Sequence, residues 1–188
     1  MMMTATPTWA QNNTLKLPTP RLLGEWMTLH ESLTKKIRAR FPNVKMQLLS
    51  ATAAPILKHE SDFYQHSIYS HYWIRNILFY QENTPLVLGR SVIPCCNNSI
   101  TATRGLLKLG AEPLGPIIFA DPQTIRSQIH SACLTRPHPL INLAERYITQ
   151  SINHLYARTS ALTYKNVPLL ITEAFLPELY AEPYEYTI

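Results

Sequence analysis

The segment YSHYWIRNILFY, residues 69–80, decides the fold, because it is an aromatic-rich strand pattern interrupted by a single arginine. Successive side chains of a strand point to opposite faces, so the odd-numbered residues share one face. Arg75 then lies beside Trp73 and Ile77 on the more apolar face. A buried guanidinium requires an anionic partner. The segment therefore predicts a strand that carries an anion-binding arginine.

A hairpin follows this strand. Residues 85–94, PLVLGRSVIP, have the pattern of a second strand after the short connection QENT. A loop with an even number of residues centred on Glu82 and Asn83 places Arg75 opposite Arg90, whereas an odd loop does not. Like charges directly opposite each other are destabilising unless an anion lies between them. We therefore expect Arg90 to join Arg75 at an anion site if the loop is even.

A second hairpin is predicted near the C-terminus, with strands at 156–164 and 167–177 joined by Lys165 and Asn166. Glu173 lies among apolar residues on one face of the second strand. An unpaired buried carboxylate costs on the order of several kcal/mol, so Glu173 is either paired or used in chemistry. An even loop places Arg158 opposite Glu173, which offers a purely structural ion pair.

The rest of the chain alternates helical and extended patterns. The predicted elements are, in chain order, a helix over 19–41, a strand over 44–57, a loop over 58–67, a helix over 97–109, a strand over 115–120 that residues 123–134 extend, and a helix over 139–150. Residues 1–18 are polar and contain two prolines, which predicts a loose N-terminal arm before a single domain over 19–188.

Composition excludes several classes of function. The chain has 188 residues, 46% of them hydrophobic and 15% charged, which is typical of one globular domain. The net charge of +5 is scattered and forms no dense basic patch, so we expect a small acidic metabolite as the ligand and no nucleic acid. No secretory signal and no apolar run of about 20 residues is present, which predicts a soluble intracellular protein.

Metal and phosphate-binding motifs are also missing from the sequence. Cys95, Cys96 and Cys133 fit no zinc-binding spacing, and the seven histidines form no HExxH pattern. The five glycines form no phosphate-binding loop. We therefore expect no metal site.

Four segments in order carry a resemblance to a known family: LLGEWMTLHESLTKKI at 22–37, YWIR and GRSVIP within 72–94, KLGAEPLG at 108–115, and LLITEAFLP at 169–177. Together they resemble the chorismate pyruvate-lyases, including the branch of photosynthetic organisms. The resemblance implies an α+β fold, an antiparallel sheet with helices packed on it and helical flaps over a buried site. It also implies that no cofactor is needed. We expect a monomer in the cytoplasm, or in the plastid stroma if the chain is plastid-encoded.

The activity implied by this resemblance is the conversion of chorismate to 4-hydroxybenzoate and pyruvate, toward the head group of a quinone such as ubiquinone or plastoquinone. The substrate contacts that it implies are Arg75, Leu114, Glu173 and Leu33, with Arg90 as a further arginine near the site. Chorismate has two carboxylates, and an arginine can bind a carboxylate bidentately. We expect Arg75 and Glu173 to be the catalytic residues. Glu173 supplies acid/base catalysis or holds the 4-hydroxyl, while Leu114 and Leu33 exclude water.

The sequence also permits other interpretations of these residues and of the function. Arg75 can pair with a glutamate inside the sheet, and Leu114 and Leu33 are ordinary core residues apart from the resemblance. The alternative function is a non-catalytic, effector-sensing domain of the same fold, and a third is an interaction protein that keeps only the fold. Effector-sensing domains usually follow a DNA-binding domain. The 18 residues before the first predicted helix are too few for a helix-turn-helix, which favours the enzyme.

Overall fold

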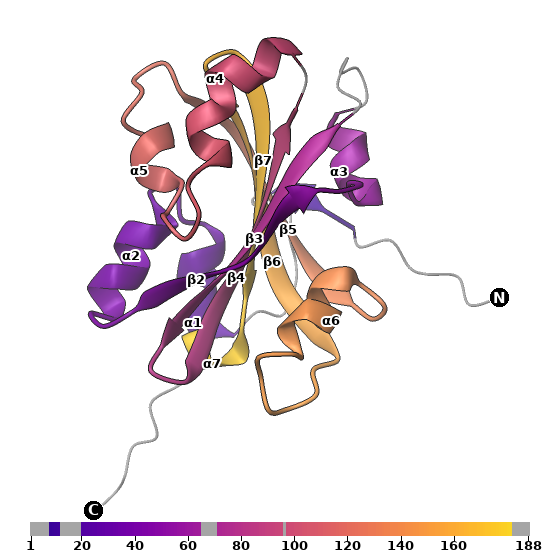
Figure 1. Ribbon diagram of the computed structural model, residues 1–188. Coiled ribbons are helices and arrows are strands. Elements are labelled where there is room, and N and C mark those ends of the chain that lie inside the picture. Colours follow the sequence, from indigo (N-terminus) through magenta and orange to yellow (C-terminus); the bar gives the residue numbers. More distant parts are fainter. Residues whose placement is uncertain (1–7, 12–19, 65–70, 96, 182–188) are drawn as a thin grey trace, which may run out of the picture.

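The computed structural model describes residues 8–11, 20–64, 71–95 and 97–181, and these form one antiparallel sheet with helices on both faces (Figure 1). The sheet has seven strands in the order β1-β5-β6-β7-β4-β3-β2. The strands are β1 (Ala10–Gln11), β2 (Lys45–Ala53), β3 (Tyr72–Gln81), β4 (Thr84–Pro94), β5 (Ile125–Thr135), β6 (His154–Tyr164) and β7 (Val167–Phe175). The helices are α1 (Arg21–Met27), α2 (Leu33–Arg40), α3 (Lys58–Phe63), α4 (Asn97–Leu107), α5 (Gly115–Ile118), α6 (Pro139–Ala144) and α7 (Pro177–Tyr180).

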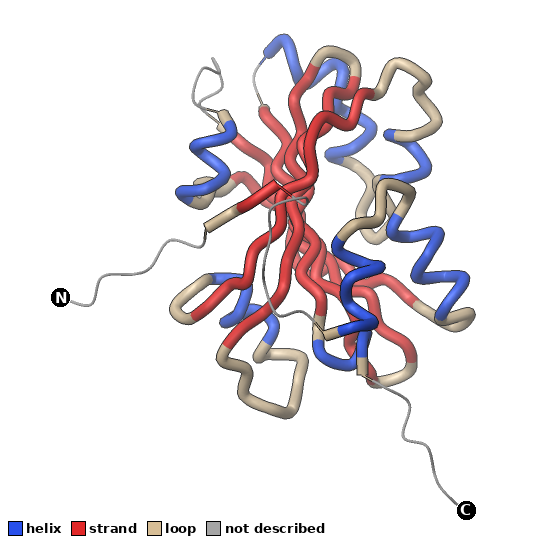
Figure 2. Tube along the Cα trace, turned by 180° about the vertical axis from the view of Figure 1, so that it is seen from behind, coloured by secondary structure: helices blue, strands red, loops and turns tan. Residues whose placement is uncertain are grey.

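The helices divide the sheet into two covered faces. Helices α1, α2, α4 and α5 lie on one side, which we call the α2 face, and α3 and α6 lie on the other, which we call the α3 face (Figures 1 and 2). Trp26 and Ile37 pack with Val87 on the α2 face, and Ile141 packs with Leu88 on the α3 face. Because both faces are covered, the central strands are buried along almost their whole length. The predicted α+β class and both predicted hairpins are confirmed.

The β3–β4 hairpin has a two-residue turn at Glu82 and Asn83, which is the even loop of the two alternatives that the sequence left open, but β4 contains a bulge directly after it. Tyr80 pairs with Pro85, whereas the preceding residue Phe79 pairs with Val87, so Leu86 is an extra residue in β4. One extra residue in a strand shifts its register by one position, so all side chains beyond it point to the face opposite to the one that the unshifted register predicts. The residues of β4 beyond the bulge are therefore one position out of the predicted register.

This bulge separates the two arginines of the hairpin. Arg75 pairs with Ser91, and Arg90 pairs with Asn76. The predicted placement of Arg75 opposite Arg90 is therefore wrong. Arg75 points to the α2 face, and Arg90 points to the α3 face.

The single helix predicted over 19–41 is also wrong, because the chain forms α1 and α2 with a break between them. The Nη1 group of Arg158 in β6 donates hydrogen bonds to the carbonyl oxygens of Trp26 at 2.8 Å and Leu29 at 2.5 Å. These bonds satisfy carbonyls where the helix stops, and such groups are costly to bury unpaired. Ser32 then starts α2 as its N-cap.

Two segments have a different structure from the predicted one. The loop predicted over 58–67 contains α3, whose buried Glu60 accepts a hydrogen bond from the Leu57 amide at 2.7 Å. The strand predicted over 115–120 is α5 instead. Pro116 lies in its first turn, where the missing amide hydrogen is tolerated, whereas a sheet would need that donor.

Other elements differ from the prediction mainly at their ends. The predicted strand over 44–57 stops at Ala53, α4 stops at Leu107 and α6 stops at Ala144. Within the N-terminal segment that the sequence predicts to be loose, residues 10–11 form β1 and pair with β5. Among the described residues, no helix is long and apolar enough to span a membrane.

Candidate active site

A small cavity lies between the α2 face of the sheet and the segments that cover it. Arg75 and Glu173, on β3 and β7, contribute to its wall, and Leu33 and Leu114 contribute to its cover. The structure thus brings together four of the five predicted site residues, which come from four distant parts of the sequence. Arg90 is the exception.

Arg75 is almost completely buried, with 2% of its surface exposed, and it has no carboxylate partner among the described residues. Its Nε and Nη2 groups donate to the Gly110 carbonyl oxygen at 3.2 and 2.9 Å, and Nη2 also donates to the Glu112 carbonyl oxygen at 2.6 Å. Burial lowers the pKa of Arg75, but an arginine remains charged in proteins. The site therefore contains a fixed positive charge that carbonyl dipoles orient and do not neutralise.

The loop after α4 gives Arg75 these acceptors. Gly110 has a φ of +53°, in the left-handed region that glycine adopts without strain. The loop directs the carbonyls of Gly110 and Glu112 toward the guanidinium, and it continues to Leu114 in the cavity cover. The orientation of Arg75 is therefore coupled to the position of the cover.

Glu173 pairs with Arg158 across the β6–β7 hairpin, in the register that the two-residue turn predicts. The Arg158 Nε group donates to Glu173 Oε2 at 2.5 Å. Arg158 is fully buried, and its side chain also caps the α1 end, so its position is strongly restrained. The predicted structural pair is thus confirmed, and Glu173 nevertheless lines the cavity.

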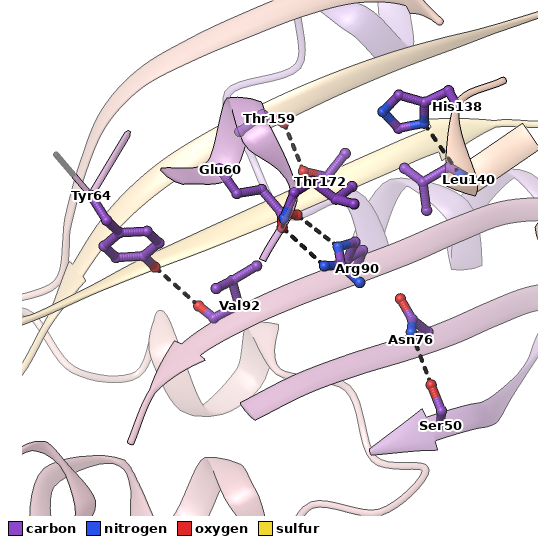
Figure 3. Close-up of polar contacts among 11 residues, drawn as sticks. Ser50, Glu60, Tyr64, Asn76, Arg90, Val92, His138, Leu140, Thr159 and Thr172 are labelled. Atoms are coloured by element: carbon purple, nitrogen blue, oxygen red, sulfur yellow. Dashed lines mark hydrogen bonds and ion pairs between the residues drawn. The ribbon is translucent and has the colours of Figure 1, made fainter. Parts of the chain in front are cut away.

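Arg90 lies outside this cavity, which corrects the expectation that it joins Arg75. Its Nε and Nη2 groups donate to Glu60 Oε1 and Oε2 at 2.7 and 2.9 Å. Figure 3 shows this bidentate pair between β4 and α3, on the α3 face. Glu60 is fully buried and Arg90 is 9% exposed. The pair neutralises the charge of Arg90, so this guanidinium is a structural group of the α3 face.

Several polar residues that the sequence pattern did not single out also line the cavity, among them Arg126 on β5 and Ser160 on β6. The Ser160 hydroxyl oxygen is buried and has no hydrogen-bond partner among the described residues. Strand alternation places Ser160 on the face of Arg158, so the β6 pattern contains a signal for it. Arg126 lies just before an irregular pairing between β5 and β6, where alternation gives no reliable face.

The cover consists of the start of α2 and the segment around α5. Ser32, Leu33 and Thr34 come from the first part, and Leu114 and Phe119 come from the second. The cavity volume is about 60 Å³, well below the roughly 150 Å³ of an engineered cavity that binds benzene. An aromatic ring can therefore enter only after the cover moves.

Chemically, the cavity combines two guanidinium groups and one carboxylate with apolar walls. This set is suited to a small organic acid with anionic groups and a hydroxyl. Among the described residues, no group of three or more His, Cys, Asp or Glu side chains is arranged to hold a metal ion.

The overall structure is similar to solved structures of bacterial proteins. PhnF from Mycobacterium smegmatis has a TM-score of 0.56 and 9% identity, with 82% of this chain and 67% of that chain covered. The ligand-binding domain of a GntR-family regulator from Bordetella bronchiseptica has a TM-score of 0.51 and 10% identity, with coverages of 72% and 86%. At such low identity these similarities concern the fold alone.

Sequence similarity identifies the family of the chain more specifically than the similarity in fold does. A probable chorismate pyruvate-lyase from Hydrogenovibrio crunogenus is 30% identical over 165 residues, 86% of this chain and 85% of the relative. The chorismate pyruvate-lyase of Pectobacterium carotovorum subsp. carotovorum is 28% identical over 171 residues, with coverages of 89% and 82%. The family model for chorismate lyase matches residues 3–184. The chain therefore belongs to the chorismate lyase family.

Proposed function

We propose that this protein is a chorismate pyruvate-lyase, which converts chorismate to 4-hydroxybenzoate and pyruvate. The observation that carries the proposal is Arg75, a buried cation without a carboxylate partner among the described residues, in a cavity of a chain that belongs to this family. A buried charge is costly unless it is compensated, and a carboxylate of the substrate supplies the missing compensation.

The proposed chemistry is an elimination within the substrate. The C4–H bond breaks, its electrons form the C3–C4 double bond of the aromatic product, and the C3–O bond to the enolpyruvyl group breaks. The enolpyruvate takes up a proton at its methylene carbon and becomes pyruvate, so the atoms of chorismate are divided between two products. Aromatisation drives the reaction.

Arg75 and Glu173 have separate roles in this proposal. Arg75 binds the ring carboxylate and orients the substrate. Glu173 either moves the proton of C4 or holds the neighbouring 4-hydroxyl, and the bond from Arg158 fixes its carboxylate in place. Leu33 and Leu114 close over the ring and exclude water.

The cellular context is part of the proposal. We propose that 4-hydroxybenzoate becomes the head group of a quinone, ubiquinone or plastoquinone, and that the protein acts as a monomer in the cytoplasm, or in the plastid stroma of a photosynthetic organism. Size-exclusion chromatography with light scattering tests the monomeric state, and a dimer with altered activity on dissociation contradicts it.

The decisive experiment mixes purified protein with chorismate and measures both products. Pyruvate is followed by reduction with lactate dehydrogenase and NADH, and 4-hydroxybenzoate is followed by chromatography. We expect equal amounts of the two, a strong loss of both with Arg75→Gln, and no change with the exposed control Arg38→Gln. Chorismate binding without either product contradicts the lyase and supports an effector-sensing domain.

A further inference from the structure

Arg126 brings a second guanidinium to the cavity that contains Arg75. Its Nη1 group donates to the His30 carbonyl oxygen at 2.9 Å, and its guanidinium carbon lies 4.9 Å from the centre of the Phe119 ring. The hydrogen bond and the cation–π contact hold the guanidinium from two parts of the cover. The side chain is thus held at the cavity by contacts that leave its charge uncompensated.

The remaining donors of Arg126 have no acidic partner in the described part of the chain. Its Nε group is buried without a hydrogen bond, and no carboxylate forms an ion pair with its guanidinium. Burial lowers the pKa of Arg126, and the negative charge of Glu173 opposes this effect. Glu173 is therefore near Arg126, but its carboxylate bonds to Arg158. Within the described ranges no carboxylate is left to compensate Arg126, so its charge is suited to an anionic group of a bound ligand.

The two uncompensated arginines correspond to the two carboxylates of chorismate. Arg75, on β3, takes the ring carboxylate in the proposed function, which leaves the enolpyruvyl carboxylate without a partner. We propose that Arg126 binds this second carboxylate and makes the site selective for the dianionic substrate over the monoanionic aromatic product. This inference rests on the proposed function for the identity of the ligand.

Loss of the enolpyruvyl group removes the ligand of Arg126 in every turnover. The product 4-hydroxybenzoate keeps only the carboxylate that faces Arg75. Removal of Arg126 must therefore weaken substrate binding much more than product binding, whereas removal of Arg75 weakens both. Replacing a residue with a merely structural role would lower the affinity for substrate and product to a similar extent.

The test compares Arg126→Gln, Arg126→Lys, Arg75→Gln and the exposed control Arg38→Gln. We expect Arg126→Gln to lower kcat/KM for chorismate by about 10- to 100-fold, the usual range for one charge-assisted hydrogen-bonded contact. The inhibition constant of 4-hydroxybenzoate should change by less than about threefold. Lysine should restore part of the loss, because it returns the charge without the planar fork.

Two results overturn the inference. One is an equal loss of affinity for substrate and product, and the other is unchanged kcat/KM in Arg126→Gln. Thermal unfolding of each variant shows whether it is folded. If Arg126→Gln does not fold, the same comparison of substrate and product affinity is made with Arg126→Lys.

If the wild type fails to turn over chorismate, the proposed function fails. Calorimetric binding of chorismate and 4-hydroxybenzoate then still tests the role of Arg126, because unequal losses support it and equal losses exclude it.

Discussion

Glu173 is held at the cavity wall by a fully buried arginine, so small changes to its side chain have separable effects. Glu173→Gln removes the proton-transfer group but leaves an amide oxygen that can accept the hydrogen bond of Arg158. We expect kcat to fall by about 10²- to 10⁴-fold, the usual contribution of general acid or base catalysis. Product affinity, measured by calorimetry, should change only a few-fold.

The matched control at this position is Glu173→Leu, which leaves the buried Arg158 without its acceptor. We expect this variant to lose stability as well as turnover, since an uncompensated buried charge is strongly destabilising. The free energy of unfolding in urea distinguishes the two variants. If Glu173→Gln retains a kcat within about threefold of the wild type, the acid/base role of Glu173 is wrong.

Arg90 and Glu60 should affect stability and not ligand binding. Removing one partner of such a buried pair typically costs about 3–5 kcal/mol, whereas replacing both by apolar residues is often close to neutral. We expect Arg90→Met to be strongly destabilised and Arg90→Met with Glu60→Leu to recover most of the loss. Urea unfolding measures both. A weakened affinity for 4-hydroxybenzoate in the folded double variant contradicts the structural role.

The β3–β4 hairpin provides a wall of the cavity at Gly89, which has no side chain to occupy the space. A Cβ atom at this position would lie 2.8 Å from the Cγ1 atom of Ile77, so that side chain would have to shift. We expect Gly89→Ala to narrow the site and to weaken 4-hydroxybenzoate binding several-fold, as measured by calorimetry. Unchanged affinity in a stable variant would show that the ring does not approach this part of β4.

Helix α6 begins at a histidine that must be neutral. The His138 Nδ1 atom accepts a hydrogen bond from the Leu140 amide at 3.2 Å (Figure 3), which a protonated nitrogen cannot do. Burial, with a smaller contribution from the neighbouring His59, lowers the pKa of His138 from 6.5 to about 4. Below pH 6.5 the unfolded chain therefore binds a proton that the folded chain does not.

The pH dependence follows from this difference in bound protons. The free energy of unfolding should fall as the pH decreases from about 6.5 to about 4, by up to about 1.4 kcal/mol per pH unit for this group. His138→Asn keeps a side-chain acceptor that does not titrate, and it should reduce the slope. Urea unfolding at several pH values measures the effect. An identical slope in the variant excludes His138 as its source.

At the scale of the whole molecule, the cover must move away from the sheet for the proposed reaction, because a cavity of about 60 Å³ is too small for the substrate ring. The segments 28–34 and 113–119, which cover it, contain short helices and loops, whereas the sheet below has continuous strand pairing. We expect backbone amides of these two segments to exchange with solvent faster than those of β4 and β7. Saturating 4-hydroxybenzoate should slow this exchange by at least about tenfold.

Hydrogen exchange followed by mass spectrometry measures the opening directly. The strands β4 and β7 serve as the internal reference, because their exchange should change less than that of the cover. If 4-hydroxybenzoate slows amide exchange only in α3 and α6, the ligand binds on the α3 face of the sheet. Equal exchange with and without bound product contradicts a moving cover.

Much of the fold and of the site follows from local rules. Strand alternation and short turns predict both central hairpins, and they identify Arg75 and Glu173 as charges on apolar faces. The pairing of Glu173 with Arg158 also follows, because a two-residue turn fixes the register between adjacent strands. Leu33 and Leu114 came only from the family resemblance, since an apolar residue of a pocket cover has the same local pattern as one of the core.

The sequence by itself determined which strands exist, how the hairpins turn and which charged residues break the apolar pattern, because these properties depend on neighbours close in the chain. The tertiary structure decided the bulge that turns Arg90 toward Glu60, the helix break that Arg158 stabilises, and the entry of Arg126 into the cavity. The contact of Arg158 with Trp26 joins residues 132 positions apart. Such contacts depend on the packing of both sheet faces, which no local pattern encodes.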